Sequence, residues 1–280
     1  MIVQNSFQNN NKNLYIVSTP IGNLSDITFR AVEILNSSDI ILAEDTRNSK
    51  ILLDKYNIKT KMSSYHDFNK DNTDNLDLIF SKFDNVALIS DAGTPLINDP
   101  GYEIVNYAYA NKINVVSIPG VTSIISALTV SALPTDQFIF LGFVNRNKNK
   151  FIETLTKYEK LESTLIFLES PLRIKETLLV IDSLFKTKEI VLARELTKKF
   201  ETIYKGTASE LLELNILEKG EYVLLISGSK EDKGLEANVE ELYKYYLVKG
   251  FSSKEAIKNV SKDTLISKNI LYNQLKVKNN

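Results

Sequence analysis

Short apolar runs alternate with amphipathic segments through the first half of the chain, and this alternation restricts the possible folds more than any other feature. The runs at 13–19, 39–45, 85–90 and 114–120 are rich in Ile, Leu and Val, which is typical of strands buried on both faces. Strands that alternate with helices predict a parallel α/β sheet covered on both faces. Amphipathic stretches follow each run and are predicted helices, at 25–39, 48–58, 71–83, 101–110 and 121–134.

A distinctive loop follows each predicted strand, and each loop carries glycine, proline or charged residues. The four loops are TPIGN at 19–23, AEDTR at 43–47, SDAGTP at 90–95 and IPGVTS at 118–123. Because parallel strands end at one edge of their sheet, these loops are expected to meet there and form one ligand site. Glycine lets the main chain approach a ligand closely, and the loop prolines stiffen the same edge. Such a rim suits a ligand with adenine, ribose and amino-acid groups.

The pattern changes after Phe138 and predicts a second, mixed α/β domain. The segment 199–207 follows a strand too closely for a crossover helix, so an antiparallel hairpin is expected there. The predicted organisation has four parts: a disordered lead-in at 1–13, an N-terminal α/β domain at 14–135, a mixed α/β domain at 136–229, and a linker with a small helical module at 230–280.

Two predicted helix starts carry residues suited to capping. Ser25 or Asp26 is expected to cap the first helix, and Ser252 the helix that begins beside it. The segment from 240 to 275 is helical in pattern throughout. It is either a helix-turn-helix-like module or a helical tail packed on the second domain or on a partner subunit.

The scarcity of two residue types excludes several kinds of chemistry. The chain has no cysteine, which rules out disulfides, thiolate metal sites and cysteine nucleophiles. It has one histidine, His66, so a histidine cluster cannot form within one chain, and no metal is expected. The net charge of −1 argues against a broad phosphate-tracking surface. We find no GxGxxG or P-loop motif, and expect neither a secretory signal nor a membrane span.

Six blocks of sequence resemble one enzyme family, in the same order. The match extends from 14 to 228, through LYIVSTPIGNLSDITFRAVEIL, ILAEDTRNSKILL, ALISDAGTPLINDPGYEIV, VVSIPGVTSIISAL, SALPTDQFIFLGF and LARELTKKFETIYKGT. These blocks are similar to the bacterial 16S rRNA ribose 2′-O-methyltransferases of the tetrapyrrole-methylase-like superfamily. One departure is IPGVTSI, where Pro-Ser or a similar pair is expected after the glycine.

The resemblance implies a two-domain methylase that binds S-adenosylmethionine between its domains. It implies methyl transfer to the ribose 2′-oxygen of a cytidine in the decoding region of 16S rRNA, within the 30S subunit. A cytoplasmic homodimer without membrane association is expected. A methylase of tetrapyrrole precursors with the same fold, and a non-enzymatic ribosome-binding protein, are the alternatives, because a fold does not fix a function.

The resemblance also implies cofactor-binding positions in both domains. Loops of the first domain are expected to supply Pro20, Gly22, Asp91, Gly93, Thr94, Pro95, Ile97, Ser123 and Ile124. The second domain is expected to supply Leu168, Glu169, Ala193, Arg194 and Tyr222. For the apolar members the alternative is core packing, and Asp91 could instead cap the turn that follows it.

Methyl transfer from a sulfonium is an in-line displacement that needs alignment and removal of the hydroxyl proton. Carboxylates at the predicted strand tips are the candidate catalytic residues, and they are Glu44, Asp45 and Glu195. We hypothesise that Asp45 or Glu195 orients or deprotonates the 2′-hydroxyl. Predicted RNA contacts are Arg47, Lys198, Arg146, Lys148 and Lys150 at phosphates, and His66 at a base. The alternatives are structural salt bridges in the cleft and an ordinary solvated loop.

Overall fold

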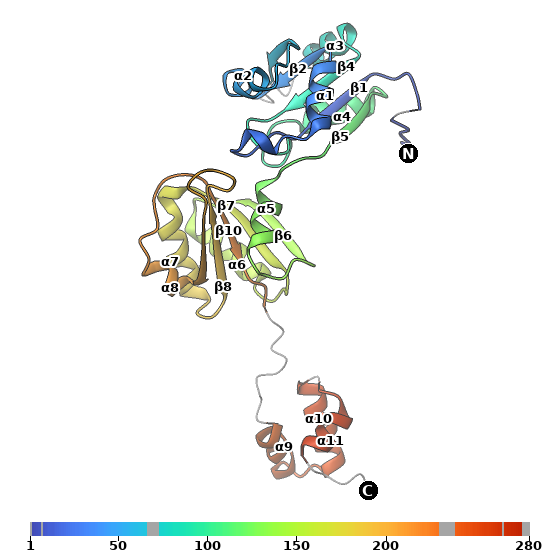
Figure 1. Cartoon of the computed structure of the whole chain (residues 1–280). Helices are drawn as coiled ribbons and strands as arrows, with labels where there is room; N and C mark the ends of the chain where they lie inside the picture. Colours follow the sequence, from blue (N-terminus) through green and yellow to red (C-terminus); the bar gives the residue numbers. More distant parts are fainter. Residues whose placement is uncertain (1, 7, 66–72, 230–238, 265, 276–280) are drawn as a thin grey trace.

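The computed structural model describes residues 2–6, 8–65, 73–229, 239–264 and 266–275. Figure 1 shows two layered α/β units, each built on a five-stranded sheet, and a group of helices near the C-terminus. The predicted fold class, two α/β domains with a C-terminal helical module, is confirmed by these sheets and helices.

Every strand pair in the first sheet is parallel, in the order β3-β2-β4-β1-β5, as predicted. Its strands are β1 (Asn13–Val17), β2 (Ile40–Ala43), β3 (Met62–Ser64), β4 (Asn85–Ile89) and β5 (Asn114–Ile118). The helices between and after them are η1 (Leu24–Asp26), α1 (Phe29–Ser37), α2 (Thr46–Lys55), α3 (Thr73–Lys82), α4 (Tyr102–Ala110) and α5 (Ser123–Val130). The sequence does not predict β3, because this edge strand is short and mostly polar.

Both faces of the first sheet are covered, as its continuously apolar strands predict. In β4, Val86 and Leu88 pack with α3 and α4, whereas Ala87 and Ile89 pack with α1 and α2. This alternation follows from the two-residue period of a strand, which sends successive side chains to opposite faces. The faces are therefore filled by core, and the loop edge is the part of this sheet left for chemistry.

Helix α1 begins later than predicted. Thr28 is its N-cap, and the Thr28 hydroxyl accepts a hydrogen bond from Ala31 N–H at 3.1 Å. Ser25 and Asp26 lie instead in η1, which Asn23 caps. The predicted cap at Ser25 or Asp26 is wrong, because Thr28 holds the extended backbone from which a hydroxyl reaches the free N–H groups of the first turn.

The described part of the lead-in is tied to the edge of the first sheet, in contrast to the disorder expected for it. Gln4 Nε2 donates to Val115 O at 2.9 Å, and Val115 N–H donates to Gln4 Oε1 at 2.9 Å. Since β5 is an edge strand, its outer main-chain groups have no neighbouring strand. The Gln4 amide satisfies both groups of Val115.

The second sheet is mixed, in the order β6-β7-β10-β8-β9. β6 pairs with β7 in parallel and the remaining neighbours are antiparallel, so the predicted mixed sheet and the β8–β9 hairpin are confirmed. Its strands are β6 (Phe138–Phe143), β7 (Thr164–Glu169), β8 (Glu189–Arg194), β9 (Thr202–Thr207) and β10 (Tyr222–Ile226). Its helices are α6 (Lys148–Tyr158), η2 (Pro171–Arg173), α7 (Ile174–Leu184) and α8 (Ala208–Leu212).

Different parts of the chain cover the two faces of the second sheet. One face packs on α6, α7 and α8 through alternate strand residues such as Phe167 and Leu224. The other face packs on α5 and Ile21 through residues such as Ile166 and Val223. Although α5 follows the last strand of the first sheet, it therefore lies on the second one (Figure 1).

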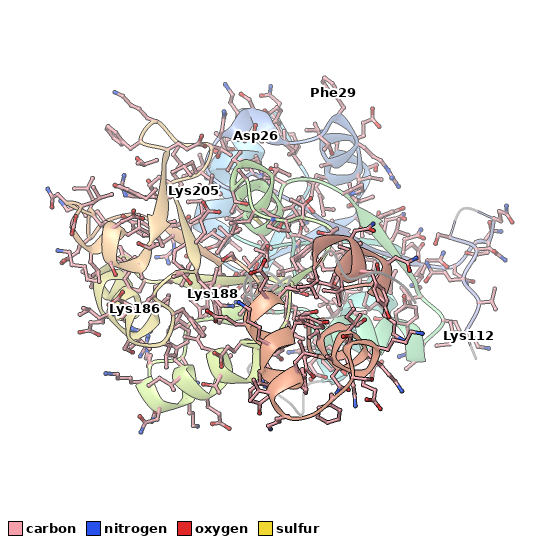
Figure 2. All side chains as sticks on the ribbon, turned by 90° about the horizontal axis from the view of Figure 1, so that it is seen from below. Asp26, Phe29, Lys112, Lys186, Lys188 and Lys205 are labelled. Carbon is pink, nitrogen blue, oxygen red and sulfur yellow. The ribbon has the colours of Figure 1, made fainter. Side chains whose placement is uncertain are left out.

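Lys205 of β9, labelled in Figure 2, fixes α5 on this face. Its Nζ donates to Ser131 O at 3.1 Å and to Ala132 O at 3.3 Å, and lies 3.3 Å from a carboxylate oxygen of Glu189. Carbonyls at a helix C-terminus lack partners within the helix, and a lysine there satisfies them. The C-terminal end of α5 is thus anchored to the second sheet.

The C-terminal module has a core of its own. Its helices are α9 (Val239–Val248), α10 (Ser253–Thr264) and α11 (Lys268–Gln274), and they bury Val239, Ile257, Val260 and Leu271 together. Ser252 caps α10 as predicted, in a reciprocal pair with Glu255: Ser252 N–H donates to Glu255 Oε2 at 3.0 Å, and Glu255 N–H donates to Ser252 Oγ at 3.4 Å. Over the ranges that the structure describes, no helix combines the length and apolar character that crossing a membrane requires.

Candidate active site where the two lobes meet

Loops that follow β1, β4 and β5 lie against one another at the carboxyl edge of the first sheet. Thr19 N–H donates to Gly93 O at 2.8 Å, and Gly93 N–H donates to Thr19 O at 3.0 Å. The hydroxyls of Ser18 and Thr94 are 2.8 Å apart, and Thr94 Oγ1 also donates to Val121 O at 3.3 Å. The three loops therefore meet, as their positions after parallel strands predict.

Two glycines allow this close approach. Gly93 has φ +83°, a conformation that side chains rarely adopt, and an added Cβ would lie 3.4 Å from Ile21 Cγ2. The loop after β5 comes closer still, because a Cβ on Gly120 would lie 2.8 Å from Ser18 Cβ. The rim is thus built largely from main chain, whose N–H and C=O groups are the usual partners of small polar ligands.

Residues with positive φ are concentrated in two loops, one after β4 in the first α/β unit and one after β8 in the second. Seven non-glycine residues of the described chain have positive φ, and four of them fall in these loops. Leu96 (φ 72°) and Asn98 (φ 65°) follow Gly93, while Glu195 (φ 52°) and Thr197 (φ 67°) follow β8. Such conformations cost about 1–3 kcal/mol each and cluster at ligand sites and switch regions. Each of the two α/β units, called lobes from here on, therefore carries this mark of a functional site.

The lobes touch where the loop after β1 meets the loop after β8. Asn23 N–H donates to Thr197 Oγ1 at 3.1 Å. The aliphatic stem of Lys198 lies directly over Gly22, where an added Cβ would be 2.5 Å from Lys198 Cγ. Beside this contact, Ile21 and Ile124 pack with Ala193 of the second sheet in one buried cluster. A ligand at the junction would meet main chain from one lobe and apolar side chains from the other.

Comparison with known proteins places the chain in a family. The sequence profile of the tetrapyrrole (corrin/porphyrin) methylases matches residues 13–212. A ribosomal RNA small subunit methyltransferase I from Halalkalibacterium halodurans is 40% identical over 292 residues, which cover 98% of each chain. Its counterpart from Rickettsia prowazekii is 46% identical over 250 residues, 87% of this chain and 88% of that one. This chain belongs to the tetrapyrrole methylase family. Within it, the chain is similar to the members named ribosomal RNA small subunit methyltransferase I.

Two solved structures with this fold have names that point to other reactions. A cobalt precorrin-4 methyltransferase superimposes with a TM-score of 0.56 at 17% identity, over 77% of this chain and 94% of that one. A diphthine synthase gives a TM-score of 0.63 at 12% identity, over 76% and 89%. At such identities the likeness shows the methylase fold alone, and the substrate must be argued from the site.

The predicted cofactor residues of the second lobe divide between the two faces of its sheet. Leu168 and Ala193 lie on the junction side, in register with Val223 between them. Glu169 and Arg194 lie on the other side, in register with Tyr222, which packs with α7 and α8. Successive residues of a strand point in opposite directions, so neighbours such as Leu168 and Glu169 cannot both face the junction.

The side chains of Glu169, Arg194 and Tyr222 therefore point away from the junction, and the prediction that these three residues contact the cofactor is left to their main chain. Each side chain is buried and already paired: Arg194 donates to Lys219 O at 2.8 Å and Phe200 O at 3.2 Å, and Tyr222 donates to Leu217 O at 2.7 Å. Glu169 accepts from Ser170 N–H at 2.7 Å and from the Thr177 hydroxyl. Only their main chain remains available to the site.

At the loop rim of the first sheet, Asp91 connects the loop after β4 to the loop after β2. Its Oδ1 accepts from Asp45 N–H at 3.0 Å and its Oδ2 accepts from Asn48 Nδ2 at 2.9 Å. Both carboxylate oxygens thus hold the start of α2, which brings the loop after β2 to the same edge. The space over Gly22, predicted to line the cofactor, is filled by the Lys198 stem.

The other predicted residues of the first lobe lie at the strand tips or just beyond them. Pro20 and Pro95 are buried in the loops after β1 and β4, while Ile97 keeps 46% of its surface exposed. Ser123 is the first residue of α5. Glu44 follows the last residue of β2 and is partly exposed.

Asp45 is poorly suited to accept a proton. It is the N-cap of α2, where its Oδ1 accepts from Arg47 N–H at 2.8 Å and Arg47 Nε at 3.1 Å, and its Oδ2 accepts from Arg47 Nη2 at 2.7 Å. The hydrogen bonds from the Arg47 side chain and main chain lower the pKa of Asp45 to about 2. It is therefore a stable anion that orients Arg47, whose side chain is 89% exposed.

Glu195 is paired in a similar way. Its Oε1 accepts from Lys198 Nζ at 3.0 Å and from Glu221 N–H at 3.0 Å, and Lys198 also pairs with the Glu221 carboxylate at 3.1 Å. Burial raises the pKa of Glu195, but these hydrogen bonds outweigh burial and lower it below its ordinary value. Gly220 leaves room for this group, since a Cβ there would lie 2.6 Å from Glu195 Cγ.

Asp99 is a candidate that the sequence reasoning did not single out. It lies in the strained loop after β4, and burial raises its pKa, although a hydrogen bond with Ser90 lowers it and the Asp91 charge adds to the increase. A carboxylate with a raised pKa is a better proton acceptor than Asp45 or Glu195. The available signal was its position in SDAGTPLINDPGY, the most unusual loop of the chain.

The predicted basic contacts are not gathered at the junction alone. Arg146, Lys148 and Lys150 are exposed at the start of α6, next to the end of β6. Arg146 and Lys148 line a separate pocket on the helix-covered face of the second sheet. His66 lies outside the described residues.

Proposed function

We propose that this chain uses S-adenosylmethionine to methylate the ribose 2′-oxygen of a cytidine in the decoding region of 16S rRNA. The observation that supports this most is the junction, where the loop after β1 meets the strained loop after β8 beside an apolar cluster. It occurs in a chain 46% identical to a protein named ribosomal RNA small subunit methyltransferase I. We infer further that the chain acts in the cytoplasm as a homodimer, on rRNA within the 30S subunit.

The residues present fit S-adenosylmethionine in chemical terms. The loop that contains Gly93 and Thr94 forms a rim built largely from main chain, which suits the polar parts of the cofactor. Ile97, Leu168 and Ala193 offer apolar contacts from the two lobes. When bound, the cofactor supplies a methyl group activated by its sulfonium.

Among the carboxylates near the rim, Asp99 best fits the role of proton acceptor. In this proposal the Asp99 carboxylate would accept the proton of the ribose hydroxyl, whose oxygen would receive the methyl group that bound S-adenosylmethionine supplies. The pKa of Asp45, about 2, and the lowered pKa of Glu195 make both weaker proton acceptors than Asp99, whose pKa burial raises. Their role in this proposal is to orient Arg47 and Lys198.

The cations around the junction would hold the RNA. Arg47 has a largely exposed guanidinium, and Lys198 stays protonated because hydrogen bonds from its ammonium to Glu195 and Glu221 outweigh burial and raise its pKa. Arg146, Lys148 and Lys150 extend the basic surface, and His66 is proposed to contact a base. Phosphate contacts of this kind depend on salt and carry little sequence information.

The test is a methylation assay on 30S subunits that lack the modification, with a radiolabelled methyl donor and mapping of the modified ribose. We expect one labelled cytidine 2′-oxygen in the decoding region. Methyl transfer to a porphyrinoid precursor, with none to 30S subunits, would instead assign the chain to small-molecule methylation. Calorimetry that detects no S-adenosylmethionine binding would favour a non-enzymatic ribosome-binding role.

A further inference from the structure

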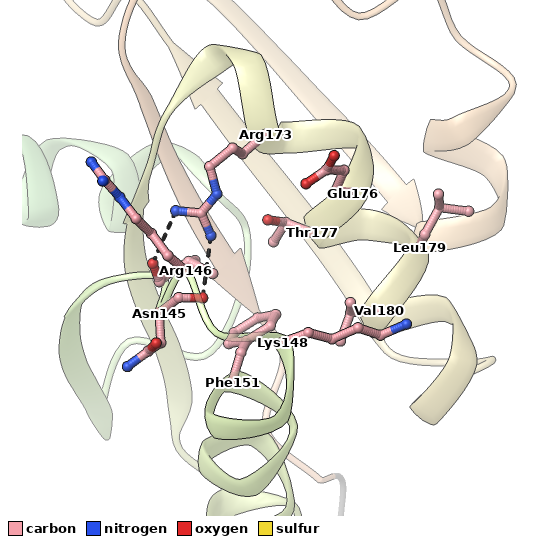
Figure 3. A pocket seen from close by; sticks show the side chains of 10 residues that line it. Asn145, Arg146, Lys148, Phe151, Arg173, Glu176, Thr177, Leu179 and Val180 are labelled. Atoms are coloured by element: carbon pink, nitrogen blue, oxygen red, sulfur yellow. Dashed lines mark hydrogen bonds between the residues drawn. The ribbon is translucent and has the colours of Figure 1, made fainter.

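A pocket of about 270 Å³ opens between the start of α6 and the start of α7 (Figure 3). Its deepest residues, Val144, Phe151 and Val180, belong to the core on the helix-covered face of the second sheet. The apolar cluster at the junction of the lobes lies on the opposite face. The pocket is therefore separate from the methyl-transfer site, and its volume is slightly below that of ordinary small-molecule sites, roughly 300–1,000 Å³.

Cations dominate the rim of this pocket. Arg146, Lys148 and Arg173 line it together with one carboxylate, that of Glu176. Within the ranges that the structure covers, neither Arg146 nor Lys148 has a carboxylate oxygen within ion-pair distance. Since the whole chain carries a net charge of −1, this local excess of positive charge is a specific feature. It complements a phosphodiester.

Arg173 holds the basic loop in place. Its Nη1 donates to Val144 O at 3.3 Å and its Nη2 donates to Asn145 O at 3.2 Å, as the dashed lines in Figure 3 show. Its Nη1 also lies 3.6 Å from the buried carboxylate of Glu169, which neutralises part of its charge. Arg173 is thus a positioning residue. Glu169, whose side chain points away from the junction, helps to hold Arg173 in place.

The loop is fixed from its other end as well. Asn147 caps α6, and its Oδ1 accepts from Asn149 N–H at 3.0 Å and Lys150 N–H at 3.2 Å. Arg146 and Lys148 flank this cap, so their backbones are held on both sides. Pre-organisation of this kind lowers the entropy lost when a ligand is bound.

The floor of the pocket is apolar. The Phe151 ring is fixed edge-to-face on Phe167, with centroids 5.6 Å apart. Cations above an apolar floor suit a single-stranded nucleotide, whose base or ribose packs on apolar groups while its phosphate meets the cations. A duplex would not enter a space of this size.

We propose that this pocket binds one single-stranded nucleotide of the substrate RNA, with its phosphate between Arg146 and Lys148. The identity of the RNA rests on the proposed function. Gly142, at the end of β6, packs against Asn98 of the strained loop: an added Cβ would lie 3.3 Å from Asn98 Oδ1. The strand that leads to the pocket thus contacts the loop that borders the junction. In this proposal one RNA segment spans both sites, and the pocket sets its register.

The test compares the double variant Arg146→Ala/Lys148→Ala with a control, Lys157→Ala/Lys160→Ala. The control removes the same charge from the same domain, at exposed positions near the other end of α6. Binding of fluorescently labelled single-stranded 16S rRNA segments is followed by anisotropy across a salt series. We expect weaker binding in the double variant and a salt slope reduced by about 0.7, the change expected for the loss of one single-strand phosphate contact. The control should keep the wild-type slope.

A wild-type affinity and slope in the double variant would overturn the proposal. Unchanged RNA binding with weakened docking to intact 30S subunits would also overturn it, and would point to a ribosomal protein as the occupant. Reversal of charge in Arg146→Glu should weaken RNA binding further than Arg146→Ala. Because the experiment measures binding, it tests the pocket separately from the methyl transfer. RNA binding that depends on the pocket but is not accompanied by methyl transfer would contradict the proposed function and support the proposed pocket.

Discussion

The two sheets have equal numbers of strands but use their faces differently. The first sheet covers both faces with α1 to α4 and leaves its loop edge for chemistry. The second covers one face with α6 to α8 and leaves the other to α5 and Ile21. The first sheet therefore contributes polar groups and strained backbone from its edge, and the second contributes apolar side chains from its face together with the strained loop after β8. This division suits a ligand that has both a charged end and an apolar or aromatic part.

The polar contribution of the first sheet is tested most severely at Asp99. If this carboxylate accepts the ribose proton, Asp99→Asn should lower kcat about 10²–10⁴-fold, because that is the usual contribution of a general base. Asp45→Asn should lower it less, since the pKa of Asp45, about 2, makes it a poor acceptor. Single-turnover methylation of 30S subunits measures both.

Binding of S-adenosylmethionine to each variant, measured by calorimetry, is the control for this comparison. Because burial raises the pKa of Asp99, the acid limb of the wild-type pH–rate profile should lie above the ordinary range of an aspartate. Equal losses in the two variants, or a larger loss in Asp45→Asn, would remove Asp99 from the mechanism.

The apolar contribution of the second sheet is tested by two neighbours that point to opposite faces. Leu168→Ala should weaken S-adenosylmethionine binding by up to about 60-fold, since it removes three carbons that contribute about 0.8 kcal/mol each when buried. Glu169→Gln should leave that affinity unchanged, because Glu169 faces the helices and pairs with Ser170 and Thr177. Calorimetric titration measures both. A weaker affinity in Glu169→Gln than in Leu168→Ala would show that S-adenosylmethionine does not bind on the face of the sheet that carries Leu168.

Much of the architecture is readable from residue patterns. Alternating apolar runs and amphipathic segments predict the parallel sheet, and the position of loops after strands predicts that Thr19, Gly93 and Val121 come together. Both predictions use local patterns together with one geometric rule, which is that parallel strands end on the same edge of their sheet. The two-residue period of a strand also shows that Leu168 and Glu169 cannot share a face.

Other features depend on long-range packing and leave weak local signals. Nothing in the sequence of α5 shows that it packs on the second sheet, because an apolar helix fits either one. The pairing of Lys198 with Gly22 joins residues far apart in the chain. Arg173 lies outside the basic loop that it holds, so its role appears only when its distances to Val144 and Asn145 are known.

The contact between the two lobes is tested at Gly22. Gly22→Ala should destabilise the protein by about 1–3 kcal/mol, because the new Cβ would overlap the Lys198 stem and overpacking has this cost. Urea unfolding measures the free energy. Adding Lys198→Ala should recover part of the loss, as double-mutant cycles show for residues in contact. Strictly additive losses would mean that the strain at Gly22 is unrelated to Lys198.

The smallest effect is expected on the far face of the second sheet, at Tyr222. Tyr222→Phe removes the hydrogen bond to Leu217 O and should cost about 1 kcal/mol of stability at pH 8, with S-adenosylmethionine affinity unchanged.

Burial raises the pKa of Tyr222 from 10.0 to about 12. The folded state therefore holds this proton more tightly than the unfolded state, so the associated stability is complete below pH 10 and is lost as the pH rises toward 12. Phenylalanine has no such proton, and the stability gap between wild type and variant should narrow between pH 8 and pH 11 in urea unfolding. Other tyrosines titrate in both proteins, so the change in the gap isolates Tyr222, and a gap that does not depend on pH would place this hydroxyl in water rather than in the core.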